Sequence, residues 1–177
     1  MQTRPENFIS ANESLRREIR SMVRGAYDLQ DNRTRMGLRV VANFKAVIGQ
    51  EPSTKESDLE KDAKELLLQL RKDFDRITDA IAGKRLIATK FDKYTKVLED
   101  DSKALISNYA EYSLAKMYFE ILKSEQEAFK HLEKVVEEHP IWTNFLVDVK
   151  GCGAAMAAVI ISEIDISKSR YPSSLVK

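Results

Sequence analysis

Residues 15–47, LRREIRSMVRGAYDLQDNRTRMGLRVVANFKAV, decide the fold class of this chain. Their apolar side chains recur every three or four residues, which is the spacing of one face of an α-helix. Gly25 and Gly37 weaken this helix, and residues 28–37 are where a bend is most expected. The apolar stripe consists of Leu15, Ile19, Met22, Ala26, Leu29, Met36, Val40, Phe44 and Val47.

The same spacing continues through three further segments. A second helix is expected to start at the capping box SDLE, where Ser57 and Glu60 can satisfy backbone groups of the first turn. A shorter stretch closes at residue 102, and from there a long helix is expected to run to Pro140. The apolar positions are Leu59, Ala63, Leu66, Leu70, Phe74, Ile77 and Ile81, then Ile87, Phe91, Tyr94 and Leu98, then Leu105, Tyr109, Tyr112, Phe119, Leu122, Phe129, Leu132 and Val136.

No segment alternates apolar and polar residues as a strand would. The sequence therefore predicts an all-α fold, a long antiparallel helical bundle or coiled-coil hairpin. We expect residues 1–138 to form this helical body and residues 139–177 to form a small module with a different pattern.

The formal net charge of +1 conceals an uneven distribution. Residues 1–50 carry nine basic and five acidic side chains, residues 51–148 carry sixteen and twenty-one, and residues 149–177 carry four and two. A chain that is basic at both ends and acidic between them fits an anionic partner bound at an end better than one that coats the whole surface.

Several function classes lack the residues they need. One cysteine excludes an internal disulfide, and His131 and His139 have no further ligand at metal-binding spacing. The first ten residues lack the apolar core of a signal peptide, and the longest apolar run, residues 151–161, is about half of what a bilayer requires. We expect a cytoplasmic protein with no metal, no cofactor, no membrane contact and no catalytic residues in this chain.

Arg16, Arg20 and Arg24 lie four residues apart, so they form a basic ridge along the first helix. Two interpretations remain open for this ridge. It is either a solvated face partly paired with Glu13 and Glu18, or a second basic face for a nucleic acid.

The segment PIWTNFLVDVKGCGAAMAAVIISEI, residues 140–164, differs from the rest of the chain. Pro140 suits the first turn of a short helix whose apolar side would be Trp142, Phe145, Leu146 and Val149. Gly151 and Gly153 allow positive φ, and Cys152 between them is interpreted as a small apolar plug rather than a nucleophile. A second helix is expected from Ala154 to about Ile164.

The second helix begins with small residues, so its first N–H groups are unshielded and suit a phosphate oxygen. Lys150 adds a positive charge beside them. The expected nucleic-acid-binding residues are Lys150, Gly151, Cys152, Gly153, Ala154 and Ala155, with Lys168 and Arg170 supporting them from the following loop.

The pattern formed by Val149, Gly151, Cys152, Gly153, Ala157 and Ile160 resembles the helix-hairpin-helix DNA-binding motif. That resemblance implies contact with the phosphate backbone through main-chain N–H groups and little reading of sequence. A tight turn between two helices, packed for structural reasons alone, is the other reading of the same residues.

Residues 139–177 also resemble the start of the C-terminal domain of the IS-one-ten group of insertion-sequence transposases. The shared features are Gly151, Gly153, Ala157, Ala158, Glu163, Ile164, Tyr171, Pro172, Ser173 and Leu175. This resemblance implies nucleic-acid handling and a relation to transposition and DNA recombination.

The chain departs from that family in two ways. Residues 1–138 show no strands and no set of four carboxylates, which the family's RuvC-like nuclease domain requires. The family's serine nucleophile lies beyond the point where this sequence stops, and Ser173 and Ser174 are better interpreted as a helix cap. Because the sequence stops where a helix should begin, we expect the natural chain to continue past Lys177.

Three hypotheses follow. The first is a binding protein that presents a helix-hairpin-helix to nucleic acid without sequence specificity; its partners would be duplex or branched DNA, or structured RNA. The second is a structural coiled-coil protein that forms homo-oligomers through its long helices and binds no nucleic acid. The third, a nuclease or transposase, has no set of residues here to support it.

Overall fold

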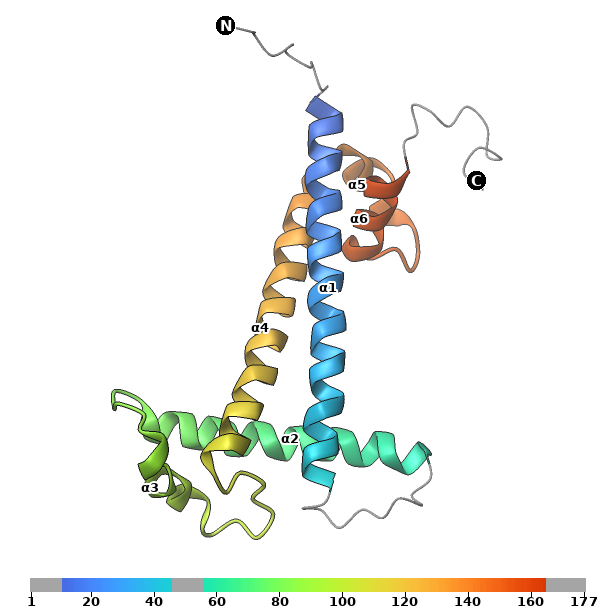
Figure 1. The fold of residues 1–177 in the computed structure, drawn as a ribbon. Helices are drawn as coiled ribbons and strands as arrows, with labels where there is room; N and C mark the ends of the chain where they lie inside the picture. The colour runs from blue at the N-terminus through green and yellow to red at the C-terminus, as the bar shows by residue number, and fades with distance from the viewer. Residues whose placement is uncertain (1–10, 46–55, 165–177) are drawn as a thin grey trace, which may run out of the picture. The chain divides into compact units, whose positions relative to one another are not determined.

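The computed structural model of this protein describes residues 11–45 and 56–164, and the side chains of residues 13–45 and 63–164. Within these ranges every regular element is a helix, so the expected all-α fold is confirmed (Figure 1). The α-helices are α1 (Ala11–Lys45), α2 (Glu56–Ile81), α3 (Asp92–Thr95), α4 (Tyr109–Glu137), α5 (Pro140–Asn144) and α6 (Ala154–Glu163). Three single 3₁₀ turns lie among them, η1 (Ala88–Lys90), η2 (Lys96–Leu98) and η3 (Leu146–Asp148).

The chain divides into two compact units. Unit 1 takes the chain up to Gln30 and from Ser124 onward, and unit 2 is Asp31–Lys123. The boundary expected at residue 139 falls inside unit 1, because residues on both sides of it share one hydrophobic core. Helices α1 and α4 each contribute residues to both units.

Unit 2 has an aromatic core between three helices. Its parts of α1 and α4 lie side by side in opposite directions, while α2 crosses them steeply instead of continuing an antiparallel bundle (Figure 1). Phe74 of α2 lies against Tyr112 and Phe119 of α4, with ring centroids 5.3 Å and 5.1 Å away. The buried residues are Met36, Val40, Phe44, Leu66, Leu70, Ile77, Phe91, Tyr94, Leu98, Leu105, Ile106, Tyr112, Ala115, Tyr118 and Phe119.

The two helix starts expected in this unit both shift. Helix α4 begins at Tyr109, so Leu105, expected within it, is buried from the preceding loop. Asn108 fixes this start, because its Oδ1 accepts a hydrogen bond from the Glu111 N–H at 3.0 Å. Helix α2 begins at Glu56, which places Ser57 in its first turn; the capping side chains expected there lie outside the described residues.

The buried core residues of unit 1 are all aliphatic, whereas those of unit 2 include several aromatic rings. Its part of α1 lies beside α4 in the opposite direction, and α5 and α6 cover the same side of this pair (Figure 1). Ala157 and Ala158 of α6 are fully buried, which lets its backbone approach α1 and α4 closely. The buried core residues are Ile19, Val23, Leu132, Val136, Leu146, Ala157, Ala158 and Ile161.

Candidate nucleic-acid interface

A tight turn joins η3 to α6. The Cys152 N–H donates to the Val149 carbonyl oxygen at 2.9 Å, and Gly151 has a φ of +88°. Among the described residues only glycines have positive φ, so φ of Lys150 is negative. Residues 149–152 therefore form a turn of the type II class. The positive φ expected at Gly151 is therefore confirmed, and this position requires glycine because of its backbone conformation.

Gly153 is different. Its φ of −77° and ψ of 168° are open to any residue, so the prediction of positive φ at this position was wrong. Gly153 is instead the N-cap of α6, where it makes no side-chain hydrogen bond because it has no side chain. A Cβ placed on it would meet no atom within 4 Å.

The first turn of α6 leaves backbone donors without intrahelical acceptors. The first i to i−4 hydrogen bond joins the Ala157 N–H to the Gly153 carbonyl oxygen at 2.9 Å, so the N–H groups of Ala154, Ala155 and Met156 precede it. Gly153 is exposed, and Ala154 and Ala155 are half-buried. Exposed Lys150 contributes the nearest positive side chain along the chain, and exposed Asp148 contributes a negative one.

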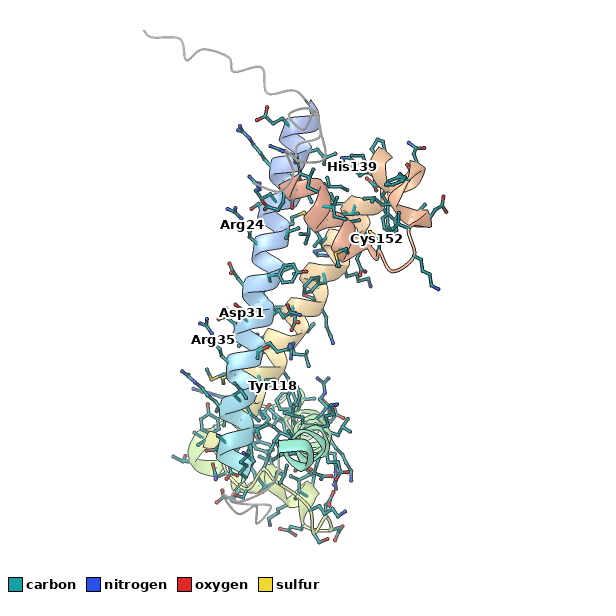
Figure 2. The ribbon with its side chains drawn as sticks, turned by 90° about the vertical axis from the view of Figure 1, so that its right-hand side faces the viewer. Arg24, Asp31, Arg35, Tyr118, His139 and Cys152 are labelled. Atoms are coloured by element: carbon teal, nitrogen blue, oxygen red, sulfur yellow. The ribbon has the colours of Figure 1, made fainter. Side chains whose placement is uncertain are left out.

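Cys152 lies half-buried against the core of unit 1, as expected for an apolar plug. Figure 2 shows it beside α6, on the side of α1 opposite to Arg24. Its sulfur has only a long contact, 4.0 Å, to the Gly153 carbonyl oxygen. The Cys152 side chain therefore packs the turn against the hydrophobic core of unit 1.

The expected apolar side of the preceding helix is wrong in part. Leu146 is buried and Trp142 is half-buried, but Phe145 is 65% exposed and Val149 is 40% exposed. The reason is that α5 ends at Asn144 and Phe145 leaves the helical region, with φ −147° and ψ −58°. The 3.6-residue period that placed these side chains on one face is lost at that point.

His139 fixes the start of α5. Its Nδ1 accepts a hydrogen bond from the Ile141 N–H at 3.2 Å, which is possible only when that nitrogen carries no proton. Partial burial lowers the pKa of His139 below its usual value of 6.5, which favours the same neutral form.

Several arginines of α1 have partners within the protein. Arg20 donates from Nε and Nη2 to the two carboxylate oxygens of Glu163, at 3.1 Å and 2.7 Å, across 143 residues of sequence. Arg17 pairs with Glu13 at 2.8 Å, and Arg16 also has an interaction partner. Arg24 is exposed and makes no hydrogen bond or ion pair with any residue that the structure describes (Figure 2).

A shallow depression on α1 gathers some of these arginines. It is lined by Arg17, Arg20, Ser21, Arg24, Gly25 and Asp28. Arg20 and Arg24 of the expected ridge lie in it, Arg16 does not, and Arg17 takes its place. Arg17 lies three residues before Arg20 and seven before Arg24, a helical spacing from which it could have been found. Lys168 and Arg170 lie outside the described residues.

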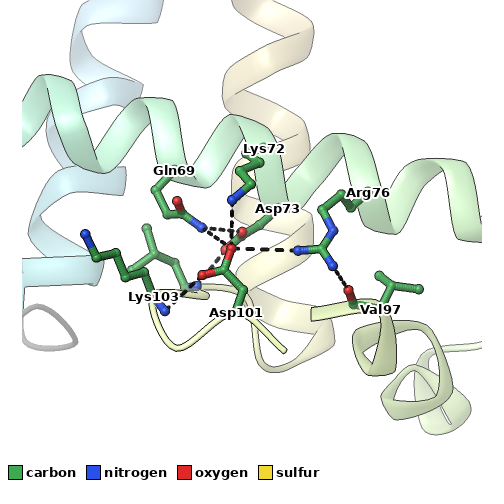
Figure 3. Close-up of polar contacts among 8 residues, drawn as sticks. Gln69, Lys72, Asp73, Arg76, Val97, Asp101 and Lys103 are labelled. Atoms are coloured by element: carbon green, nitrogen blue, oxygen red, sulfur yellow. Dashed lines mark hydrogen bonds and ion pairs between the residues drawn. The ribbon is translucent and has the colours of Figure 1, made fainter. Parts of the chain in front are cut away.

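Unit 2 holds a polar cluster that the sequence pattern did not indicate (Figure 3). Asp73 is fully buried and accepts hydrogen bonds from the Leu105 N–H at 2.6 Å and from Gln69 Nε2 at 2.8 Å. Burial raises the pKa of Asp73, although its hydrogen bonds to the backbone of Leu105 and Ile106 act in the opposite direction. The carboxylate therefore ties the loop before α4 to α2.

Asp101 completes this cluster. It accepts from Lys72 Nζ at 2.9 Å and from Gln69 Nε2 at 3.2 Å, and the hydrogen bond from Lys72 is the main cause of its pKa falling to about 2. Arg76 lies 3.7 Å from the same carboxylate and donates to the Val97 carbonyl oxygen. Every acid here has a protein partner, which is typical of a structural cluster.

The described residues also bear on two other kinds of site. They contain no group of three or more His, Cys, Asp or Glu side chains placed to hold a metal ion. Nor do they contain a helix with the length and apolar character needed to cross a membrane.

Comparisons of the chain with protein-family models, with curated proteins and with solved structures give no match. The resemblances to the helix-hairpin-helix motif and to the transposase domain therefore stay predictions.

Proposed function

We propose that this protein binds the sugar-phosphate backbone of DNA, without sequence specificity, through the turn at residues 149–153 and the first turn of α6. One observation supports this most: an exposed glycine turn leads directly into a helix start that has no side-chain cap. Backbone N–H groups at a helix start, reinforced by the helix dipole, favour an anionic oxygen.

The same features explain why the site reads no sequence. Its donors are main-chain groups of Gly153, Ala154 and Ala155 together with the mobile ammonium of Lys150, and none of these presents a side-chain pattern to base edges. Affinity then comes from phosphate contacts. The logarithm of the binding constant should fall linearly with the logarithm of the salt concentration, with a slope of about −0.9 for each phosphate neutralised. A relation to transposition, suggested by the resemblance of residues 139–177, is part of this proposal.

Substitution of Gly153 by a capping residue tests the proposal, because it should raise the stability of α6 and lower its affinity for an anion. In Gly153→Asp the new carboxylate caps the N–H groups of α6, which should stabilise unit 1 by roughly 0.5–1 kcal/mol. The same carboxylate occupies the phosphate site, so binding to labelled duplex DNA, measured by fluorescence anisotropy, should fall to the limit of detection. Gly153→Ser caps without charge and should weaken binding less.

Thr143→Asp is the matched control, since it adds one negative charge at an exposed position of α5, outside residues 149–153. If Gly153→Asp and Thr143→Asp weaken binding equally, the effect is one of net charge and the turn is not the site. Duplex, branched and single-stranded DNA and structured RNA, compared at two salt concentrations, identify the preferred ligand.

A second candidate function is self-association through the long helices. Leu38 of α1 and Leu68 of α2, both in unit 2, are 69% and 71% exposed, and they are the most exposed of the large apolar side chains that the structure describes on these two helices. Light scattering tests this candidate: Leu68→Glu should convert an oligomer to a monomer without changing DNA binding. A wild-type protein that is monomeric at high concentration excludes it.

A further inference from the structure

The depression on α1 is nearly balanced in charge, although it is lined by three arginines. Arg17, Arg20 and Arg24 contribute three positive charges. Three negative charges compensate them: Glu13 pairs with Arg17, Glu163 pairs with Arg20, and Asp28 is part of the lining. The arginines therefore attract an outside anion weakly as long as these three carboxylates stay in place.

Glu163 differs from the other two carboxylates because it comes from another helix. It is the last residue of α6, and it meets Arg20 through two parallel hydrogen bonds. A phosphate group can take the same two donors in the same arrangement, so Glu163 occupies a place that suits a phosphate.

The pair is also exchangeable. The side chains of Arg20 and Glu163 are 36% and 49% exposed, so solvent screens their attraction and an outside anion can reach the guanidinium. In addition, Glu163 lies at the carboxyl end of α6, where a negative charge opposes the helix dipole. Displacing Glu163 from Arg20 therefore costs the fold little.

From this arrangement we propose that Arg17, Arg20 and Arg24 form a second phosphate-binding site for the nucleic-acid backbone, which Glu163 keeps partly closed. The proposal rests on the proposed function for its ligand class. Figure 2 shows Arg24 on the side of α1 opposite to Cys152, so this site is separate from the glycine turn.

A nucleic acid fits this site better than an acidic peptide does. A carboxylate from outside would replace Glu163 by an equivalent group and would gain no interaction. A duplex carries about one negative charge per 1.7 Å of its axis and releases counterions where a guanidinium binds it, so it can displace an intramolecular carboxylate.

Glu163→Gln is the deciding variant, and Glu137→Gln is its matched control. Each substitution removes one negative charge from the last residue of a helix of unit 1, and the structure describes no ion pair for Glu137. Binding of the full chain to a labelled DNA duplex is measured by anisotropy across a series of salt concentrations, and thermal unfolding confirms that each variant is folded.

Glu163→Gln should strengthen binding several-fold at low salt and steepen the salt dependence by about 0.9, the slope expected for one more phosphate contact. Glu137→Gln should change binding only slightly. Adding Arg20→Ala to Glu163→Gln should abolish the gain, and Arg24→Ala should weaken binding in both backgrounds.

Equal binding by Glu163→Gln and Glu137→Gln overturns this inference, and so does a gain that survives Arg20→Ala. If polyglutamate displaces the labelled duplex as effectively as unlabelled duplex does, the assignment of this site to phosphate is overturned. If Gly153→Asp still weakens binding in those cases, the proposed function stands and only the arginine site fails. A gain in Glu163→Gln with no effect of Gly153→Asp rejects the turn instead, and no binding by any variant rejects both.

Discussion

The two units differ in whether the polar groups described above are buried and paired within the protein. In unit 2 the buried carboxylate of Asp73 is fully used, by the Leu105 N–H and by Gln69, and Asp101 has Lys72 and Arg76 beside it. In unit 1 the start of α6 has no side-chain cap, and the ion pair between Arg20 of α1 and Glu163 of α6 is exposed.

This difference separates structural chemistry from candidate binding chemistry. A buried polar group whose hydrogen bonds are all made has nothing left for a ligand, and it stabilises the fold by satisfying neighbours that would otherwise be unpaired. Backbone donors at an exposed helix start are satisfied by water and can exchange it for an anion. The polar cluster of unit 2 is therefore structural, whereas the residues of both proposed phosphate sites belong to unit 1.

The largest expected effect concerns Asp73. Asp73→Ala removes the acceptor of the buried Leu105 N–H and should lower the free energy of unfolding by about 2–4 kcal/mol. Asp75→Ala, on the same helix, removes only an exposed pair with Arg71 and should cost about 0.5 kcal/mol or less. Urea denaturation measures both, and equal losses would contradict the structural role given to the buried carboxylate of unit 2.

The two glycines within α1, one in each unit, give a smaller effect that should differ between the units. In unit 1 a Cβ on Gly25 meets no atom within 4 Å, so Gly25→Ala should stabilise by about 0.5–1 kcal/mol through helix propensity. In unit 2 a Cβ on Gly37 would lie 3.2 Å from Tyr118 Cε2, in a core of packed rings, and the strain should cancel that gain or exceed it. Thermal unfolding of the two variants compares them directly; a larger gain at Gly37 would show that Tyr118 yields easily.

The smallest effect is a pH dependence in unit 2. The pKa of Asp101 falls from 3.8 to about 2, so the folded state binds this proton less readily than the unfolded state does. Its contribution is present above pH 3.8 and is lost as the pH falls towards 2. Asp101→Asn should flatten the loss of stability in that window, as measured by urea denaturation at a series of pH values. A loss as steep as in the wild type would mean that Asp101 is not responsible.

Local patterns in the sequence were sufficient for the helices and for one special backbone position. Apolar residues every three or four positions predict α1, α2 and α4, because that spacing depends only on the geometry of a single helix. Positive φ at Gly151 was predicted because glycine tolerates it, although the same reasoning failed at Gly153, where the N-cap conformation is open to any residue. The start of α4 at Tyr109 was missed, yet Asn108 and Glu111 carry a recognisable capping signal three residues apart.

Tertiary structure alone decided which groups lie near one another. Arg20 and Glu163 are 143 residues apart in sequence, and Leu105 reaches Asp73 from a loop, so no periodic pattern could link them. The exposure of Phe145 follows from a break in the helix after Asn144, which the apolar spacing does not reveal. Helix formation depends on neighbours a turn away, whereas burial and ion pairing depend on where distant segments meet; the sequence therefore determined the helices, and the packing of these helices determined which charges remain available.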